Sequence, residues 1–300
     1  MTRLETWLFA PGSGRKLAAV RIGLCSTLAF RLSRPLYLGL SGQPRALYRP
    51  LSFMHLFGSM PSRSLTQAAQ IVGVTAAVLA ATGLLARITL PAAWACGILL
   101  NGMATSIGKV VHNDVLLLLA LVPLLAAPTS EWWSLDALLS RRSHDPDWSA
   151  RYGWPVKTAM VVAAGGYFFT GLSKLVFSGP AWALSSNLRW ALYQSSDGRG
   201  HPNALAIFIA DRPIIAHLLA ALTLVIELGF PLVLLRPKLA WFFVPAAVGL
   251  HIAIRASMDL DYSAWAATIV VLFTNWPAVI DRLRSRLAER RTPDVRVLPV

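Results

Sequence analysis

The feature that most constrains this chain is its series of long apolar segments. Residues 68–85, for example, form a stretch of 18 residues without a charged side chain. A membrane β-barrel is built from segments of about ten residues with alternating polarity, and this continuous pattern does not fit it. Inside a bilayer, a helix satisfies its own backbone hydrogen bonds. The sequence therefore predicts an all-α protein, a polytopic bundle of transmembrane helices.

Eight apolar segments predict eight helices. They lie near residues 17–32, 68–85, 88–107, 114–127, 158–177, 214–235, 239–254 and 262–280. The fourth has only 13 uninterrupted apolar residues, fewer than the roughly 20 that a span needs, so seven spans are the alternative. We divide the chain into an N-terminal segment (1–16), a transmembrane domain (17–280) and a basic tail (281–300).

The basic residues predict the orientation of this bundle. The chain has 28 Lys and Arg against 14 Asp and Glu, a net charge of +14. These basic residues are dispersed over short loops, so the expected partners are membrane lipids and not nucleic acid. Sixteen of them fall in the loops on the side of the termini and nine in the other loops. The positive-inside rule then places both termini in the cytoplasm, with the plasma membrane as the expected location.

Ionisable side chains within or beside the predicted helices are the candidate site residues, because a bilayer makes them costly. In the predicted topology those that map to the outer half of the membrane include His112, Asp114, Lys174, Glu227 and His251. We predict that Lys174, His112 and Glu227 approach one another in one cavity. The competing interpretation of Lys174 is a helix-end lysine that extends to the lipid headgroups.

A second pattern surrounds Lys174. Tyr167, Gly171 and Lys174 follow the spacing i, i+4, i+7, so they share one helix face. The glycine leaves room there for a flat ligand, which makes Tyr167 and Gly171 candidate cofactor-binding residues. Close helix packing is an equally good reason for a glycine at this position.

Other site classes have weaker support. No metal-ligand motif occurs, and Cys25 and Cys96 lie in apolar helices as expected of buried free thiols. Gly171 and Ser173 match the GxS pattern of intramembrane serine proteases, in which the serine pairs with a histidine on a later helix, here His251. A protease of this kind is a minor alternative for the function.

Four segments resemble, in the same order, the membrane domain of vitamin K-dependent gamma-glutamyl carboxylase and its bacterial HTTM (horizontally transferred transmembrane) relatives. These are GKVVHNDVLLLLAL, YFFTGLSKL, IELGFPLVLL and HIAIRASMDLDY. The second is similar to the family's YFxxGxxKL segment. The resemblance spans about residues 17–280 and implies an HTTM-like fold.

The resemblance also implies roles for the candidate residues. Lys174 would be the base that deprotonates a quinol, His112 a proton partner, and Glu227 and His251 supporting polar groups. The chain departs from the family at Ser173, where the family has a second lysine, and in stopping after the last helix without the large lumenal domain that engages the protein substrate. Carboxylation of protein glutamate is therefore not expected. The expected function is an oxidoreductase or modifying enzyme acting on a quinol or another lipid-soluble substrate. The alternative is a non-catalytic membrane module, such as a transporter or assembly partner.

Overall fold

The computed structural model describes residues 2–108, 111–140, 147–197 and 202–291. This part of the chain is mainly helical, and its one small sheet pairs β1 (Gly12–Ser13) with β2 (Trp148–Ser149) in antiparallel register. By length and composition, four helices are able to cross a membrane, or up to six if each of two bent pairs forms one span. The predicted all-α class is confirmed, and the apolar helices are compatible with an integral membrane protein.

The helices long and apolar enough for a span are α4 (Arg63–Thr82), α5 (Ala86–Thr105), α8 (Ala150–Ser178) and α14 (Ala240–Met258). The bent pairs are α11 (Ala204–Ala210) with α12 (Pro213–Gly229), at 98°, and α15 (Ser263–Phe273) with α16 (Trp276–Arg291), at 74°. Two further helices are α2 (Gly14–Leu32), which carries four basic residues, and the short apolar α6 (Val115–Leu125).

Short elements fill the connections. They are α1 (Arg3–Leu8), α3 (Leu36–Leu40), α7 (Leu135–Ser140), α9 (Ala181–Leu184), α10 (Asn187–Asp197) and α13 (Leu232–Leu235). Three turns of 3₁₀ helix, Arg45–Leu47, Ser52–Leu56 and Pro237–Leu239, complete the set.

Local chemistry explains where several helices begin and end. The Ser62 side chain caps the first turn of α4 by accepting from Leu65 N, and Gly83 ends that helix with a φ of +73°. The prediction of one continuous helix over 214–235 is wrong, because α12 ends at Gly229 and a turn at 230–231 precedes α13. Pro231 lacks the N–H that would continue the helical hydrogen bonds.

Other predicted boundaries also change. Predicted helix 262–280 breaks between α15 and α16, and the helix predicted from residue 158 begins at Ala150. The proposed N-terminal segment 1–16 overlaps the first turn of α2, and the proposed tail boundary at 281 lies inside α16. Residues 292–300 of that tail lie outside the described part of the chain.

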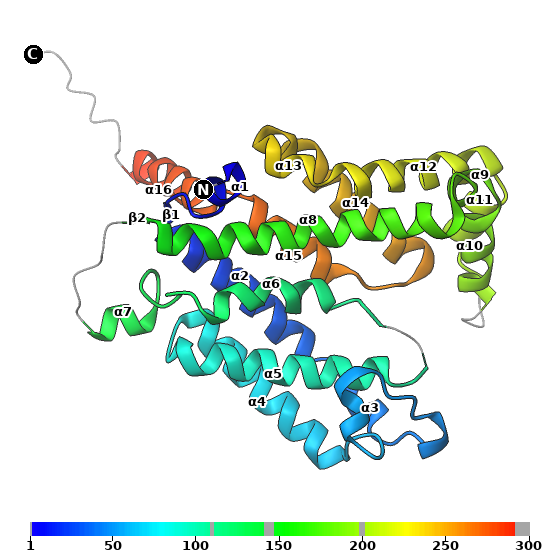
Figure 1. The fold of residues 1–300 in the computed structure, drawn as a ribbon, viewed down its shortest axis with the longest axis horizontal. Helices are drawn as coiled ribbons and strands as arrows, with labels where there is room; N and C mark the ends of the chain where they lie inside the picture. The colour runs from blue at the N-terminus through cyan, green and yellow to red at the C-terminus, as the bar shows by residue number, and fades with distance from the viewer. Residues whose placement is uncertain (1, 109–110, 141–146, 198–201, 292–300) are drawn as a thin grey trace, which may run out of the picture.

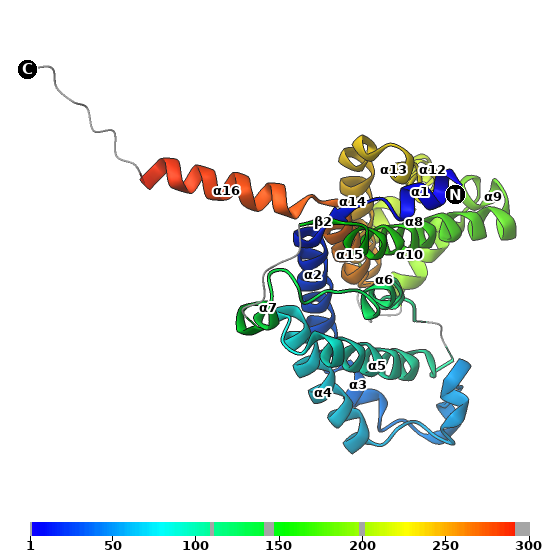
Figure 2. The ribbon, with the colours of Figure 1, turned by 60° about the vertical axis from the view of Figure 1, so that its left-hand side comes forward.

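The long helix α8 runs through the bundle (Figure 1), with α12 and α14 on one side of it and α4 and α5 on the other. Helices α2 and α15 pack against each other between these groups. Figure 2 shows that α16 extends away from the bundle. The aliphatic core includes Leu24 and Leu28 of α2 and Leu117 and Leu121 of α6, all nearly inaccessible to solvent.

The connections gather at two ends of the bundle. At one end, where Figure 1 shows the N-terminus, β1, β2 and the start of α16, Arg15 forms ion pairs with Asp147 and Asp281. At the other end, Arg31 at the close of α2 pairs with Asp261 in the connection between α14 and α15. The candidate site residues lie toward this second end.

Candidate functional site

Lys174 of α8 and Glu227 of α12 form a direct ion pair. The lysine Nζ donates to both Glu227 carboxylate oxygens, at 2.6 Å to Oε1 and 2.7 Å to Oε2. The Glu227 side chain is 8% exposed and that of Lys174 is 20% exposed. The predicted approach of these two residues therefore occurs, and Lys174 is not a lysine that extends alone to the headgroups.

Gly171 lets the two helices come this close. A Cβ atom at this position would lie 2.9 Å from Glu227 Cβ and 3.0 Å from Leu228 Cγ, closer than side chains normally pack. The space that the sequence analysis assigned to a flat ligand is thus filled by α12. Of the two interpretations of Gly171, close helix packing is the one observed.

Trp182, which no sequence pattern indicated as a site residue, lies next to Lys174. The lysine Nζ lies 5.1 Å from the centre of the Trp182 ring, within the range of a cation–π contact. Phe177, Leu184 and Trp190 nearby in sequence are more than two-thirds exposed. The ion pair therefore lies beside a connection rich in exposed apolar side chains.

Tyr167 lies on α8 one turn before Gly171 and two turns before Lys174. Its hydrogen-bond partner is His251 of α14 and not a residue of the ion pair. Its hydroxyl lies 2.6 Å from His251 Nε2. The Tyr167 ring is stacked on Phe230, with centroids 4.5 Å apart, and Trp265 meets it edge to face. These contacts leave Tyr167 only 1% exposed, so the surface proposed for a cofactor is covered.

His251 has one unused polar atom. Its residue is 8% exposed, and its Nδ1 has no hydrogen-bond partner among the described residues. The ring of His251 also lies 5.7 Å from that of Tyr262, nearly parallel to it.

His112 joins the same aromatic cluster from the connection before α6. Its Nε2 lies 2.8 Å from the Tyr262 hydroxyl, and its carbonyl accepts from Trp265 Nε1 at 3.0 Å. His112 thus reaches His251 through Tyr262, whereas its described contacts do not include Lys174 or Glu227. The described contacts therefore join Lys174 to Glu227 but do not bring His112 directly to them.

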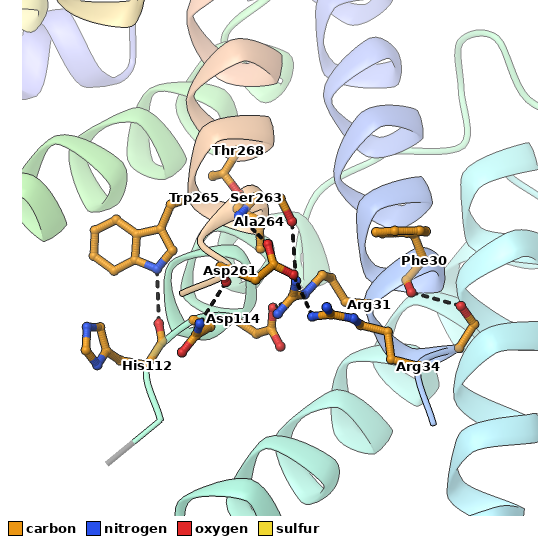
Figure 3. A network of polar contacts seen from close by, with 12 residues as sticks. Phe30, Arg31, Arg34, His112, Asp114, Asp261, Ser263, Ala264, Trp265 and Thr268 are labelled. Atoms are coloured by element: carbon orange, nitrogen blue, oxygen red, sulfur yellow. Dashed lines mark hydrogen bonds and ion pairs between the residues drawn. The ribbon is translucent and has the colours of Figure 1, made fainter. Parts of the chain in front are cut away.

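Asp114 belongs to a separate ionic network (Figure 3). It forms an ion pair with Arg31, and the second carboxylate of the network, Asp261, accepts from Arg31 at 2.6 Å and from Arg34 at 2.7 Å. Burial by itself would raise the pKa of Asp261, but hydrogen bonds from Ser263 and the charge of Arg31 outweigh it and hold the pKa below its usual range. Asp114 and Asp261 therefore hold the end of α2 and do not extend the Lys174 site.

The serine–histidine pair that an intramembrane protease would need is not formed by Ser173 and His251. Ser173 is exposed and its hydroxyl donates to the Thr170 carbonyl at 2.8 Å, while His251 is engaged with Tyr167. Cys25 and Cys96 are free thiols, Cys25 buried and Cys96 partly so. Within the described ranges, no three His, Cys, Asp or Glu residues are grouped to hold a metal ion.

The site has one acid–base pair and one aromatic–histidine cluster, both between apolar helices. No protein-family model, curated protein or solved structure matches the chain.

Proposed function

We propose that this chain is an eight-span, HTTM-like membrane protein that acts on a quinol or a similar lipid-soluble hydroxyl compound. In this proposal both termini are cytoplasmic, the membrane is the plasma membrane, and the site lies in its outer half. The observation that carries the proposal is the Lys174–Glu227 ion pair, which is partly exposed between two apolar helices. Ionisable groups at such positions are costly and commonly serve a function.

The geometry divides the chemistry between the two residues. Both oxygens of Glu227 accept from Lys174 Nζ, an arrangement that stabilises the ammonium form. A protonated lysine cannot accept a proton, so Glu227 is the better proton acceptor for a substrate hydroxyl. The Lys174 ammonium would then stabilise the oxyanion that forms. This differs from the role that the family resemblance implies for Lys174.

His112 has a secondary place in this proposal. It is connected to the region of the ion pair through Tyr262, His251 and Tyr167, the last of which lies on the same helix face as Lys174. The proposal therefore assigns His112 no direct contact with the substrate. Its substitution is expected to change activity less than substitution of Glu227.

The test follows oxidation of a short-chain naphthoquinol to the quinone by the purified protein in air-saturated buffer, where dissolved O2 takes up the two electrons and two protons as hydrogen peroxide, and the protein-free rate is subtracted. We expect Glu227→Gln and Lys174→Met to lose activity, while Lys174→Arg keeps part of it, because guanidinium retains the charge. The matched control is Lys238→Met, which removes an exposed lysine in the 3₁₀ turn Pro237–Leu239. Unchanged activity in Glu227→Gln and Lys174→Met would refute the proposal.

A specific observation favours a second candidate, the non-catalytic membrane module. The ion pair and the Tyr167–His251 bond satisfy polar groups across helix contacts, and Gly171 is tightly packed. If the chain is such a module, Glu227→Gln and Lys174→Met should lower the stability of the fold in proportion to any loss of function. The enzyme proposal predicts that Lys174→Arg and Glu227→Gln differ in activity at equal helix content.

A further inference from the structure

A cavity of about 640 Å³ lies at the opposite end of the bundle from the Lys174 site. It opens between the start of α2, the first turns of α8, and the α13 and α15–α16 connections. Lys157, one of its lining residues, lies 17 positions before Lys174 on α8, which corresponds to about 25 Å at the helical rise of 1.5 Å per residue. The cavity is therefore separate from the proposed active site.

Three basic and two acidic side chains line this cavity, a formal net charge of +1, and both acidic side chains pair with the same arginine. Arg15 Nε lies 2.9 Å from Asp147 Oδ2, and Arg15 Nη1 lies 3.1 Å from Asp281 Oδ2. Burial would raise the pKa of Asp147, but the hydrogen bonds from Arg15 and Ser13 lower it below its usual range. Arg15 thus has both carboxylates as partners.

The other two basic residues have no carboxylate partner among the described residues. Lys157 Nζ donates at 2.7 Å to the carbonyls of Trp7 and Ala10, which are neutral acceptors. No described residue forms a hydrogen bond or ion pair with the Lys16 ammonium, which also lines the cavity. An anion bound in the cavity would supply these two ammonium groups with a counter-ion.

The remaining lining indicates what kind of anion fits. Val156, Met160, Val233 and Phe273 provide an apolar wall. Trp148, which also lines the cavity, is 66% exposed, as expected of an aromatic side chain at a membrane interface. An anion with an apolar chain matches this combination of lysines, aliphatic wall and exposed tryptophan.

We propose that this cavity binds the anionic phosphate headgroup of a membrane lipid, with Lys16 and Lys157 as its cationic contacts. Part of an acyl chain would lie along Val156 and Met160. Basic pockets between membrane helices bind anionic headgroups by the same physics. A small soluble phosphate offers the same charge but leaves the apolar wall without a ligand group.

The test measures lipid retention by the full-length protein in neutral detergent, using native mass spectrometry. Phosphatidylglycerol is titrated against phosphatidylcholine, and glycerol 3-phosphate is added in a separate arm. We expect one phosphatidylglycerol to bind in preference to phosphatidylcholine, and Lys16→Gln to weaken its binding about fivefold. Lys16→Arg keeps the charge and should retain binding.

Control variants separate this site from general attraction to anionic lipid. Lys238→Gln removes an exposed lysine that does not line the cavity, and its binding should stay within about twofold of the unmodified protein. Lys157→Gln gives a second, independent loss of charge, and thermal unfolding without added lipid checks that each variant is folded. Equal retention by Lys16→Gln and Lys238→Gln would overturn the proposal. Equal affinity for glycerol 3-phosphate and phosphatidylglycerol would also overturn it, in favour of a soluble phosphate site.

Discussion

Substitution of Gly171 by alanine tests how tightly α8 and α12 are held together. The added Cβ would lie 2.9 Å from Glu227 Cβ and 3.0–3.1 Å from two atoms of Leu228. Glu227 Cβ is fixed to the α12 backbone, so relief requires the two helices to move apart. Overpacking of this kind costs about 1–3 kcal/mol.

Gly165 provides the matched control on the same helix. A Cβ there would meet only Phe169, at 3.8 Å or more, which is ordinary van der Waals contact. Alanine is favoured over glycine inside a helix by about 0.5–1 kcal/mol, and this gain applies to both variants. Gly165→Ala is therefore expected to be neutral or stabilising, and the difference between the two variants isolates the packing cost.

The assay is equilibrium unfolding in mixed detergent and SDS micelles, followed by loss of helical circular dichroism. Gly171→Ala should be less stable than Gly165→Ala by about 1–3 kcal/mol. Gly171→Ala should also weaken the Lys174–Glu227 contact, because Gly171 packs against Glu227 Cβ. Equal stability of the two variants would refute the close approach of α8 and α12.

Three further predictions concern the polar network and the topology. Tyr167→Phe leaves His251 Nε2 buried without its partner, so thermal unfolding should show a loss of about 1–3 kcal/mol, unlike Tyr193→Phe at an exposed bond. Because the pKa of Asp261 is lowered by folding, its stabilisation is complete above the usual value of 3.8 and is lost as the pH falls below it. Asp261→Asn should therefore reduce the acid sensitivity of unfolding, and an unchanged acid profile would contradict this. A reporter fused after residue 300 should be active only in the cytoplasm; activity outside would refute the topology.

The apolar helices were predictable from the sequence because long uncharged segments allow few other structures. Their breaks were harder to predict, since hydropathy is continuous across Phe230 and Pro231 while the missing proline N–H ends the helix. The break between α15 and α16 differs, because it falls at two polar residues, Thr274 and Asn275, inside the predicted helix 262–280.

The candidate site was predictable only in part. The high cost of isolated charges in lipid correctly indicated a partner for Lys174 and Glu227. Tyr262 and Trp265 carried no such signal, because aromatic residues in apolar segments are ordinary core residues, yet they separate His112 from the ion pair. Asp114 was assigned to the wrong group, since its partner Arg31 lies far away in sequence and no local spacing indicates their contact.

The most direct test of the proposed function is to locate a bound quinol. A photoreactive naphthoquinol analogue is cross-linked to the purified protein and the labelled peptides are identified by mass spectrometry. We predict labels near Lys174 and Trp182 and on α12 near Glu227, all reduced in Lys174→Met. Labelling spread over the exposed apolar surface, or left unchanged by Lys174→Met, would contradict a quinol site at this ion pair.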